Sequence, residues 1–199
     1  KQMWDKGLVY QGYKVTPHCP RCGTSLSSHE VALGYQDDVE DQSVYIKFKV
    51  SEKSMGKFPS DKPVYFLAWT TTPWTIPAHL AIALHPDFTY VAVDVGGEIY
   101  ILAEGLLEEV MKKFGIKKYK VLEKFPGKKL EGLKARHPFL DRDSLIILAS
   151  YVTLDAGTGC VHTAPGHGQE DYESGVRYGL EVYSPVDDDG RFTQDVLFF

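Results

Sequence analysis

The hydrophobic and polar positions divide the chain into a short polar stretch and a longer part with regular periodicity. Residues 1–35 contain Pro17, Pro20 and Gly23 and keep neither the period of two of a strand nor the period of 3.6 of a helix. Beyond residue 35, apolar positions recur in runs whose spacing fits strands or helices. We therefore predict a connecting arm over residues 1–35 and a folded domain over residues 36–199.

Several short segments have the pattern of β-strands. Residues 43–50 alternate apolar and polar positions, whereas 64–69 form a continuous apolar run that suits a strand buried on both faces. Two runs rich in β-forming residues, 88–95 and 98–103, are joined by Gly96-Gly97, a tight hairpin connection. Further strands are predicted over residues 118–125, 144–152 and 159–163.

Two segments have the pattern of helices. Within 104–114, apolar residues recur at helical spacing and Gly115 supplies a C-terminal stop. Within 169–178, two acids stand in the first turn and Gly179 follows the end, positions that the helix dipole and a left-handed cap favour. Many short strands with two helices predict a mainly β, α+β domain, a closed or nearly closed β-barrel with peripheral helices.

Composition narrows the class of protein. The chain has 199 residues, 43% hydrophobic and 25% charged, which is typical of one globular domain. No apolar run approaches the roughly 20 residues that span a bilayer, so no membrane partner is expected. Three cysteines and the lack of an apolar leader favour a reducing compartment, and we expect the cytoplasm. Because the chain starts at Lys1 and stops at Phe199 without an initiator Met or a polar tail, we expect a piece of a longer protein.

The charge is distributed unevenly. Residues 112–129 contain eight lysines and one acid, Glu123, although the whole chain has a net charge of −5. Such a run is usually a solvated face, and it is also typical of a surface that contacts phosphates.

Two cysteines near the start have the spacing of half a zinc site. Cys19 and Cys22 are separated by Pro-Arg, the knuckle spacing that holds two thiolates on a tetrahedral zinc, but a closed structural site needs four ligands. His18 and His29 would complete it, or a second cysteine pair would lie outside this chain. The alternative is two ordinary reduced cysteines in a turn.

A glycine-rich segment, 157–171, is the first candidate for chemistry. Its glycines would let backbone approach a ligand closely at a strand-to-helix turn. Three interpretations compete with a capped helix beside a buried histidine. A metal would use His162, His167 and Asp171, although the spacing fits no metal motif. A cysteine hydrolase would pair Cys160 with His162 but lacks an orienting third group. A binding pocket would present Asp171 to a substrate ammonium, with His162 as a wall.

A threonine cluster is the second candidate. Two prolines, Pro73 and Pro77, delete backbone donors and predict a rigid loop that leads into a helical turn. Its hydroxyls could orient a water or hold an oxyanion, but nothing basic stands beside them and no G-x-S-x-G elbow is present. They could equally cap backbone groups at a strand end. The cluster consists of Thr70, Thr71, Thr72 and Thr75.

Four strings, taken together, resemble the editing domain inserted in isoleucyl-tRNA synthetases. They are Trp-Thr-Thr-Thr-Pro-Trp-Thr-Ile-Pro at 69–77, His-Pro-Asp-Phe at 85–88, the glycine-rich segment 157–171, and 19–34 with its cysteine pair. They are long, non-repetitive and in the family's order, and the resemblance covers essentially the whole chain. Valyl and leucyl relatives carry a Thr-Thr-Arg-Pro type of loop, which favours the isoleucyl branch, although their editing domains are an alternative.

The resemblance implies a proofreading hydrolase that removes valine from mischarged tRNA for isoleucine and also hydrolyses valyl-adenylate. A hydrophobic pocket gains only about 1 to 3 kcal/mol from one methylene, a limit that this enzyme family itself illustrates, so a second, smaller sieve is needed. The family editing reaction uses no cofactor, and zinc would bind at Cys19 and Cys22 in the full-length ATP-dependent ligase. The partners implied are tRNA and the valine ester, and we expect a monomer. The alternative from another class is a non-catalytic module that binds the acceptor end.

The resemblance also assigns roles to residues. Asp171 matches the carboxylate that anchors the α-ammonium, and His162 matches the residue whose bulk excludes isoleucine. Thr70, Thr71 and Thr72 match the loop that holds the terminal adenosine and positions the attacking water, and with Asp171 they form the predicted catalytic set. The substrate-binding set adds His162 and the residues Trp69, Thr75 and His79.

Position 79 departs from the family, which commonly has asparagine there. If His79 lines the pocket, contacts to the adenosine or the pH dependence would differ from those of relatives. The alternative is a tolerated surface substitution.

Overall fold

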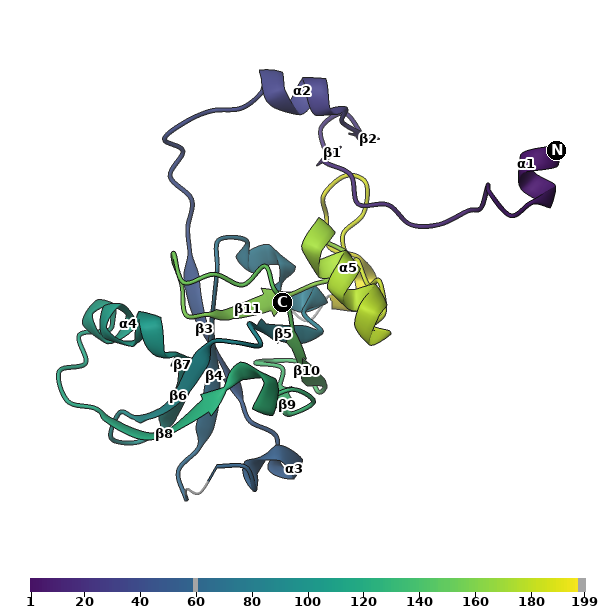
Figure 1. The fold of residues 1–199 in the computed structure, drawn as a ribbon. Helices are drawn as coiled ribbons and strands as arrows, with labels where there is room; N and C mark the ends of the chain where they lie inside the picture. Colours follow the sequence, from purple (N-terminus) through teal and green to yellow (C-terminus); the bar gives the residue numbers. More distant parts are fainter. Residues whose placement is uncertain (59–60, 197–199) are drawn as a thin grey trace.

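The computed structural model describes residues 1–58 and 61–196 (Figure 1). The N-terminal stretch holds only short elements, and none of residues 1–45 is buried. These elements are helix α1 (Gln2–Asp5), the antiparallel pair β1 (His18–Cys19) and β2 (Thr24–Ser25), and helix α2 (Ser28–Leu33). Helix α2 forms because the Ser27 hydroxyl and the Glu30 carboxylate cap its first turn reciprocally.

One sheet forms the body of the molecule, with the strand order β8-β6-β7-β4-β11-β5-β10-β9 and with β3 paired to β4. Its strands are β3 (Val44–Lys49), β4 (Val64–Thr70), β5 (Ala81–Leu84), β6 (Thr89–Asp94), β7 (Ile99–Ala103), β8 (Lys120–Pro126), β9 (Lys134–Arg136), β10 (Asp143–Leu148) and β11 (Cys160–Thr163). A short helix, α3 (Glu52–Met55), follows β3.

Strand β4 is the branch point of this sheet. One edge pairs antiparallel with β3 along its length, while the other edge pairs in parallel with β7 at Val64–Phe66 and with β11 at Trp69. A strand with neighbours on both edges and layers on both faces needs the continuous apolar run that the sequence shows. The strand is therefore buried as predicted, and its C-terminal end is held between β3 and β11.

The sheet curls back on itself. An isolated bridge joins Val50, just after β3, to Ala135 of β9, and the N–H of Ser51 donates to the carbonyl of Lys134. The far edge of the sheet thus returns to β3, which is already paired with β4. A mixed α+β domain with a strongly curled, half-barrel sheet confirms the predicted fold class.

The predicted hairpin and first helix are both present. Strands β6 and β7 pair antiparallel across the turn that contains Gly96, whose φ is +110°. The 3₁₀ turn η2 (Glu104–Leu106) and helix α4 (Leu107–Lys113) then follow, and Val110 and Met111 bury against the sheet. In Figure 1, α4 and α5 lie on different sides of the sheet.

The second predicted helix is α5 (Gln169–Tyr178), which ends at Gly179 in the left-handed conformation with φ +65°. Five residues separate it from the end of β11, so its first turn lies beside the C-terminal end of that strand. The 3₁₀ helix η1 (Pro73–Ala78) follows the end of β4 in the same way. Parallel pairing of β4 with β11 therefore brings the threonine loop and the start of α5 together.

The structure differs from the predictions in a few elements. Strands β5 and β9 lie where no strand was predicted, because segments of four and three residues are too short to show a period and are fixed by their neighbours β10 and β11. The strand predicted over 144–152 ends at Leu148. Residues 127–129 and 194–196 form the single 3₁₀ turns η3 and η4. Among the described residues, no helix has the length and apolar character needed to cross a membrane.

Candidate functional site

A cleft of about 370 Å³ opens where the C-terminal ends of β4 and β11 meet the first turn of α5. The strand β4 contributes the threonine loop, β11 contributes His162, and α5 contributes Asp171. The predicted residues that line the cleft are Trp69, Thr70, Thr71, Thr72, Thr75, His162 and Asp171. Residues that are far apart in the sequence therefore share one cavity.

The threonine loop is organised by its own hydroxyl groups. The Oγ1 of Thr70 accepts a hydrogen bond from the backbone N–H of Thr72 at 3.1 Å, and the two hydroxyl oxygens are 3.2 Å apart. Thr71, between them, is exposed, and its side chain has no hydrogen bond within the described part of the chain. Two of the three threonines thus fix the loop, and the third presents a free hydroxyl to the cleft.

Thr75 connects this loop to β11. Its hydroxyl donates to the backbone carbonyl of Thr72 at 2.8 Å, and the same oxygen lies 2.8 Å from Nε2 of His162. The side chain is buried because Pro73 starts a 3₁₀ helix that turns Thr75 inward. The conformation of the loop and the position of His162 are therefore coupled through one hydroxyl.

His162 is a neutral imidazole in the cleft wall. It belongs to β11, is 6% exposed, and lies beside Ile82 in the register of β5. Burial lowers its pKa to about 4, because the charged form would lose its hydration. At neutral pH the ring is therefore an uncharged, rigidly held surface and not a cationic one.

His79 does not line the cleft. The side chain has 0% exposure, lies behind His162 with the two Nδ1 atoms 2.7 Å apart, and packs on the ring of Phe48 with a centroid distance of 4.3 Å. Both sequence-based interpretations, a pocket-lining residue and a surface substitution, are therefore wrong. Burial, together with the neighbouring histidines His162 and His137 and with Arg142, holds the pKa of His79 well below its ordinary value.

Asp171 stands in the first turn of α5 with its carboxyl largely removed from water. Oδ2 accepts a hydrogen bond from the backbone N–H of Ala164 at 2.8 Å. Burial raises the pKa of Asp171 to about 6, and that hydrogen bond opposes the shift. A desolvated carboxylate beside an open cavity favours a cationic ligand, because an incoming ammonium replaces the lost hydration.

Two glycines allow the backbone to form the floor of the cleft. Gly157 has φ +79°, and a Cβ on it would lie 3.0 Å from the indole ring of Trp69. Gly159 has φ +72°, and a Cβ there would lie 2.4 Å from Cβ of Ala103. Side chains at these two positions would be strained and would clash with their neighbours.

Sequence reasoning missed several residues of the site. Tyr151, Thr153 and Glu170 also line the cleft, and so does His167, which the sequence suggested only as a metal ligand. His137 and Arg142, between β9 and β10, support the threonine loop from behind: Nε2 of His137 lies 2.9 Å from the carbonyl of Ile76, and Arg142 donates to the carbonyl of His79 at 2.8 Å. No local pattern marks these residues, because only the curl of the sheet brings them to η1.

The structure does not support the other chemical interpretations of this region. Among the described residues, no three His, Cys, Asp or Glu side chains are grouped so as to hold a metal ion. His162, His167 and Asp171 therefore do not form such a group. The thiol of Cys160 is buried, and its burial raises its pKa far above neutrality, so the thiolate that a cysteine hydrolase needs is disfavoured.

The cysteine pair in the arm remains half a site. Cys19 and Cys22 lie side by side in the β1–β2 turn, and Nε2 of His18 lies 2.8 Å from the carbonyl of Asp188. Within residues 1–58 and 61–196 neither His18 nor His29 forms a metal-binding group with the two thiols. In this arrangement the two histidines do not join the thiols, and zinc binding at Cys19 and Cys22 stays a prediction.

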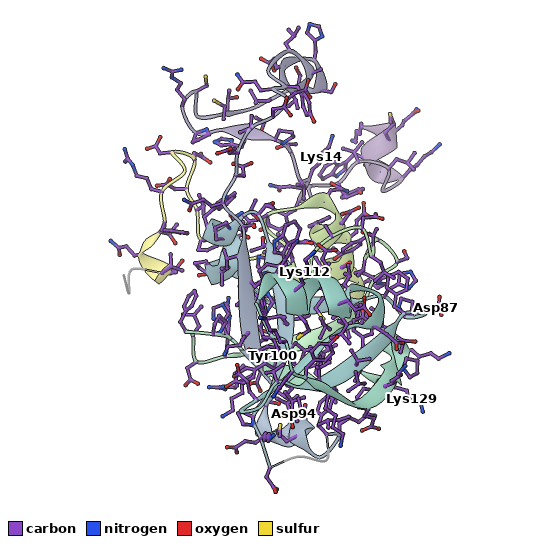
Figure 2. The ribbon with its side chains drawn as sticks, turned by 90° about the vertical axis from the view of Figure 1, so that its left-hand side faces the viewer. Lys14, Asp87, Asp94, Tyr100, Lys112 and Lys129 are labelled. Carbon is purple, nitrogen blue, oxygen red and sulfur yellow. The ribbon has the colours of Figure 1, made fainter. Side chains whose placement is uncertain are left out.

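The lysine segment covers part of α4, β8 and the turns beside them. Figure 2 looks onto this side of the molecule, with Lys112 on α4 and Lys129 beyond β8. Of the eight lysines, Lys113 pairs with Glu109 and Lys124 pairs with Glu104, while the other six form no ion pair with the described residues. Most of this positive charge is therefore available to a partner.

Comparison with known sequences shows what the chain is similar to. A family model described as "Leucyl-tRNA synthetase, editing domain" matches residues 103–195. The isoleucine–tRNA ligase of Fervidobacterium pennivorans is 52% identical over 196 residues, which are 98% of this chain and 20% of that protein. That of Thermoanaerobacter sp. (strain X514) is 51% identical over 196 residues, or 96% of this chain and 21% of that protein. The chain spans about a fifth of the length of these curated relatives.

Comparison with solved structures shows the same fold. The editing domain of the P. knowlesi cytosolic leucyl-tRNA synthetase superposes with a TM-score of 0.59 at 19% identity, covering 77% of this chain and 69% of that one. The corresponding P. falciparum domain gives a TM-score of 0.54 at 17% identity and covers 71% of each chain.

Proposed function

Because the chain is an editing domain of the class I tRNA synthetase type, homologous to isoleucine–tRNA ligases over nearly its whole length, we propose that it hydrolyses the ester of valine mischarged onto tRNA for isoleucine. The same cleft would hydrolyse valyl-adenylate, whose aminoacyl group presents the same ammonium and carbonyl. The whole reaction is an acyl transfer to water.

The observation that carries this proposal is the pairing of a buried carboxylate with a set of hydroxyls in one cleft. Asp171 offers a negative charge to the α-ammonium of an aminoacyl ester, and the hydroxyl of Thr71 faces the same cavity. An ammonium–carboxylate contact fixes the ester relative to the loop. Water held by hydroxyls then attacks the carbonyl carbon, and the gain comes from orientation.

No strong general base is required of this chain. His162 is neutral with both ring nitrogens hydrogen-bonded, and His79 is buried behind it, so neither ring can take a proton from water as the first step. The developing oxyanion would be stabilised by loop donors, and the departing ribose oxygen would take the proton that the water loses. We therefore propose a reaction without a covalent enzyme intermediate.

His162 is proposed to set the upper size of the amino-acid side chain. Its ring is held on both sides, by Thr75 and by His79, so it cannot move aside at low energetic cost for one additional methylene. Because the ring is rigid, the additional methylene of isoleucine would clash with it, whereas a flexible side chain would move aside. Valine would fit, and isoleucine would be refused.

Partners and location follow from the same proposal. The substrate would be the 3′ end of tRNA for isoleucine, with the lysine segment facing its phosphates, and the domain would act as a monomer in the cytoplasm. A non-catalytic module that binds the acceptor end is the alternative that the lysine segment favours. It predicts binding without turnover.

The His162→Ala variant tests the sieve. We expect it to cleave the isoleucyl ester, which the unchanged chain leaves intact, while it still cleaves the valyl ester. Continued protection of the isoleucyl ester in a variant that cleaves the valyl ester would contradict the steric role of His162. Failure to cleave either ester in the chain and in the full-length ligase alike would favour the binding module.

A further inference from the structure

A continuous row of hydrogen bonds leads from the interior of the barrel to the threonine loop. Nδ1 of His79 lies 2.7 Å from Nδ1 of His162, and Nε2 of His162 lies 2.8 Å from the hydroxyl of Thr75. That hydroxyl donates to the carbonyl of Thr72 at 2.8 Å. The row connects a fully buried residue to the loop that lines the cleft.

The direction of each hydrogen bond in this row follows from its last member. A carbonyl can only accept, so the single hydroxyl proton of Thr75 points to Thr72, and Thr75 must accept from Nε2–H of His162. His162 then has a lone pair on Nδ1, and His79 must donate to it from Nδ1–H. The protonated nitrogen of each ring is thereby fixed.

The far end of the row agrees with this assignment. Nε2 of His79 is buried and has no hydrogen-bond partner among the described residues. In the tautomer derived above this atom is a lone pair, whereas the opposite tautomer would leave an N–H buried and unsatisfied. The groups that face His79 are the His137 ring and the guanidinium of Arg142, and no carboxylate lies against it in the described structure. Nothing there stabilises a second proton.

We propose that His79 is a positioning residue of the editing site: it donates from Nδ1–H to Nδ1 of His162, and so fixes the tautomer and orientation of the ring that refuses isoleucine. The inference rests on the proposed function for its kinetic consequence, but the hydrogen-bond pattern can be measured separately.

His79 is itself held firmly enough to act in this way. Its ring packs on Phe48, its backbone N–H donates to the carbonyl of Ile76 at 2.9 Å, and its carbonyl accepts from Arg142 at 2.8 Å. The backbone is thus fixed on both sides of the residue. A ring held by packing and by its own backbone fixes the ring that it contacts.

Three substitutions separate the hydrogen bond from the packing. His79→Asn keeps an N–H donor on the atom that follows Cγ, as Nδ1 does, so it should retain discrimination between the two esters. His79→Leu fills similar space but has no hydrogen-bond donor. His79→Asp places a carboxylate oxygen, an acceptor, against the lone pair on Nδ1 of His162. For these two we expect discrimination to fall roughly tenfold or more, because Nδ1 of His162 loses its partner and the ring reorients.

The direct test is ¹⁵N NMR of this chain with labelled histidine at neutral pH. We expect His162 protonated only on Nε2 and His79 protonated only on Nδ1, and we expect His79→Leu to broaden or shift the His162 signals while His79→Asn preserves them. Phe48→Leu is the matched packing variant: it loosens the other face of His79 but keeps the Nδ1–H donor, so it should keep the tautomers and lower discrimination less than His79→Leu does.

The outcomes distinguish the two proposals. A His162 protonated on Nδ1, or an imidazolium at either position at neutral pH, would overturn the role of His79 whatever the activity. Equal loss of discrimination in Phe48→Leu and His79→Leu would overturn it as well, since packing alone would then explain the effect. If NMR finds the derived tautomers but neither this chain nor the full-length ligase cleaves an ester, the hydrogen-bond assignment stands and the proposed hydrolysis is rejected.

Discussion

Asp171 accepts a hydrogen bond from the backbone N–H of Ala164 at 2.8 Å, and this contact ties the first turn of α5 to the end of β11. One carboxylate oxygen is therefore used to hold the two elements together at the cleft. The contact fixes the carboxylate beside the cleft, where an ammonium would bind, although burial raises its pKa to about 6. Burial of the charged carboxylate therefore costs stability, whereas binding of an ammonium needs that charge.

This competition predicts that Asp171→Asn stabilises the fold while it abolishes editing. The asparagine oxygen can keep the hydrogen bond from Ala164, and the cost of burying a charge disappears, so we expect the free energy of unfolding at pH 7 to rise by about 1–2 kcal/mol. Urea denaturation of both chains measures it. A variant that is less stable than the parent would show that the carboxylate is not strained by burial.

Stability should fall as the pH is lowered from about 6.5 toward 4. Burial holds the pKa of His162 and His137 at about 4 and lowers that of His79, whereas an unfolded histidine titrates near 6.5. The unfolded chain therefore binds more protons in this window, so acid favours it. Asp171, with its raised pKa, acts in the opposite sense between about 3.9 and 6 and offsets part of the effect.

We expect a net loss of at least about 2 kcal/mol between pH 6.5 and 4.5, measured by denaturant unfolding at each pH. His162→Gln should flatten the dependence, because it removes one of the groups that take up a proton on unfolding. A pH-independent stability over this range would contradict the picture of buried neutral histidines.

The threonines of the loop should separate into structural and chemical roles. Thr71 has a free hydroxyl at the cleft, so Thr71→Ala should leave the unfolding free energy within about 0.5 kcal/mol of the parent and slow ester cleavage roughly tenfold or more. Thr70 is buried and accepts from the N–H of Thr72, so Thr70→Ala should also cost about 1 kcal/mol of stability. Equal stability losses in the two variants would contradict this division.

The lysine segment should contribute to binding of the tRNA and not to the chemical step. Replacing Lys112 and Lys129 by alanine removes two cations without a salt-bridge partner among the described residues, so the slope of log KM against log salt should decrease by about 1 to 2, with kcat unchanged. Lys53 and Lys57, near α3, provide the matched control pair. An unchanged slope would identify the segment as a solvated face.

Features that are determined by residues close together in the sequence were predicted correctly, and features that depend on remote segments were not. The β6–β7 hairpin and helix α5 were predicted because their turn glycines and caps lie within a few residues of the elements. Strand β5 was not, because four apolar residues become a strand only through pairing with β10 and β11.

The site shows the same distinction. The threonine loop, His162 and Asp171 were candidates from the residue pattern, a resemblance that spans the chain assigned their roles, and they share the cleft. His79 was misplaced because its spacing after Pro77 says nothing of the direction in which η1 turns it. His137 and Arg142 were missed because only the curl of the sheet brings them to η1.

The central claim is that this cleft hydrolyses a valyl ester by anchoring its ammonium on Asp171. The most direct measurement compares release of amino acid from valyl- and isoleucyl-tRNA for isoleucine by the unchanged chain and by Asp171→Ala, repeated in the full-length ligase. We predict selective release of valine by the parent, with the release lost in the variant while the tRNA is still bound. Valine release that persists in Asp171→Ala, or equal release of both amino acids by the parent, would contradict the account.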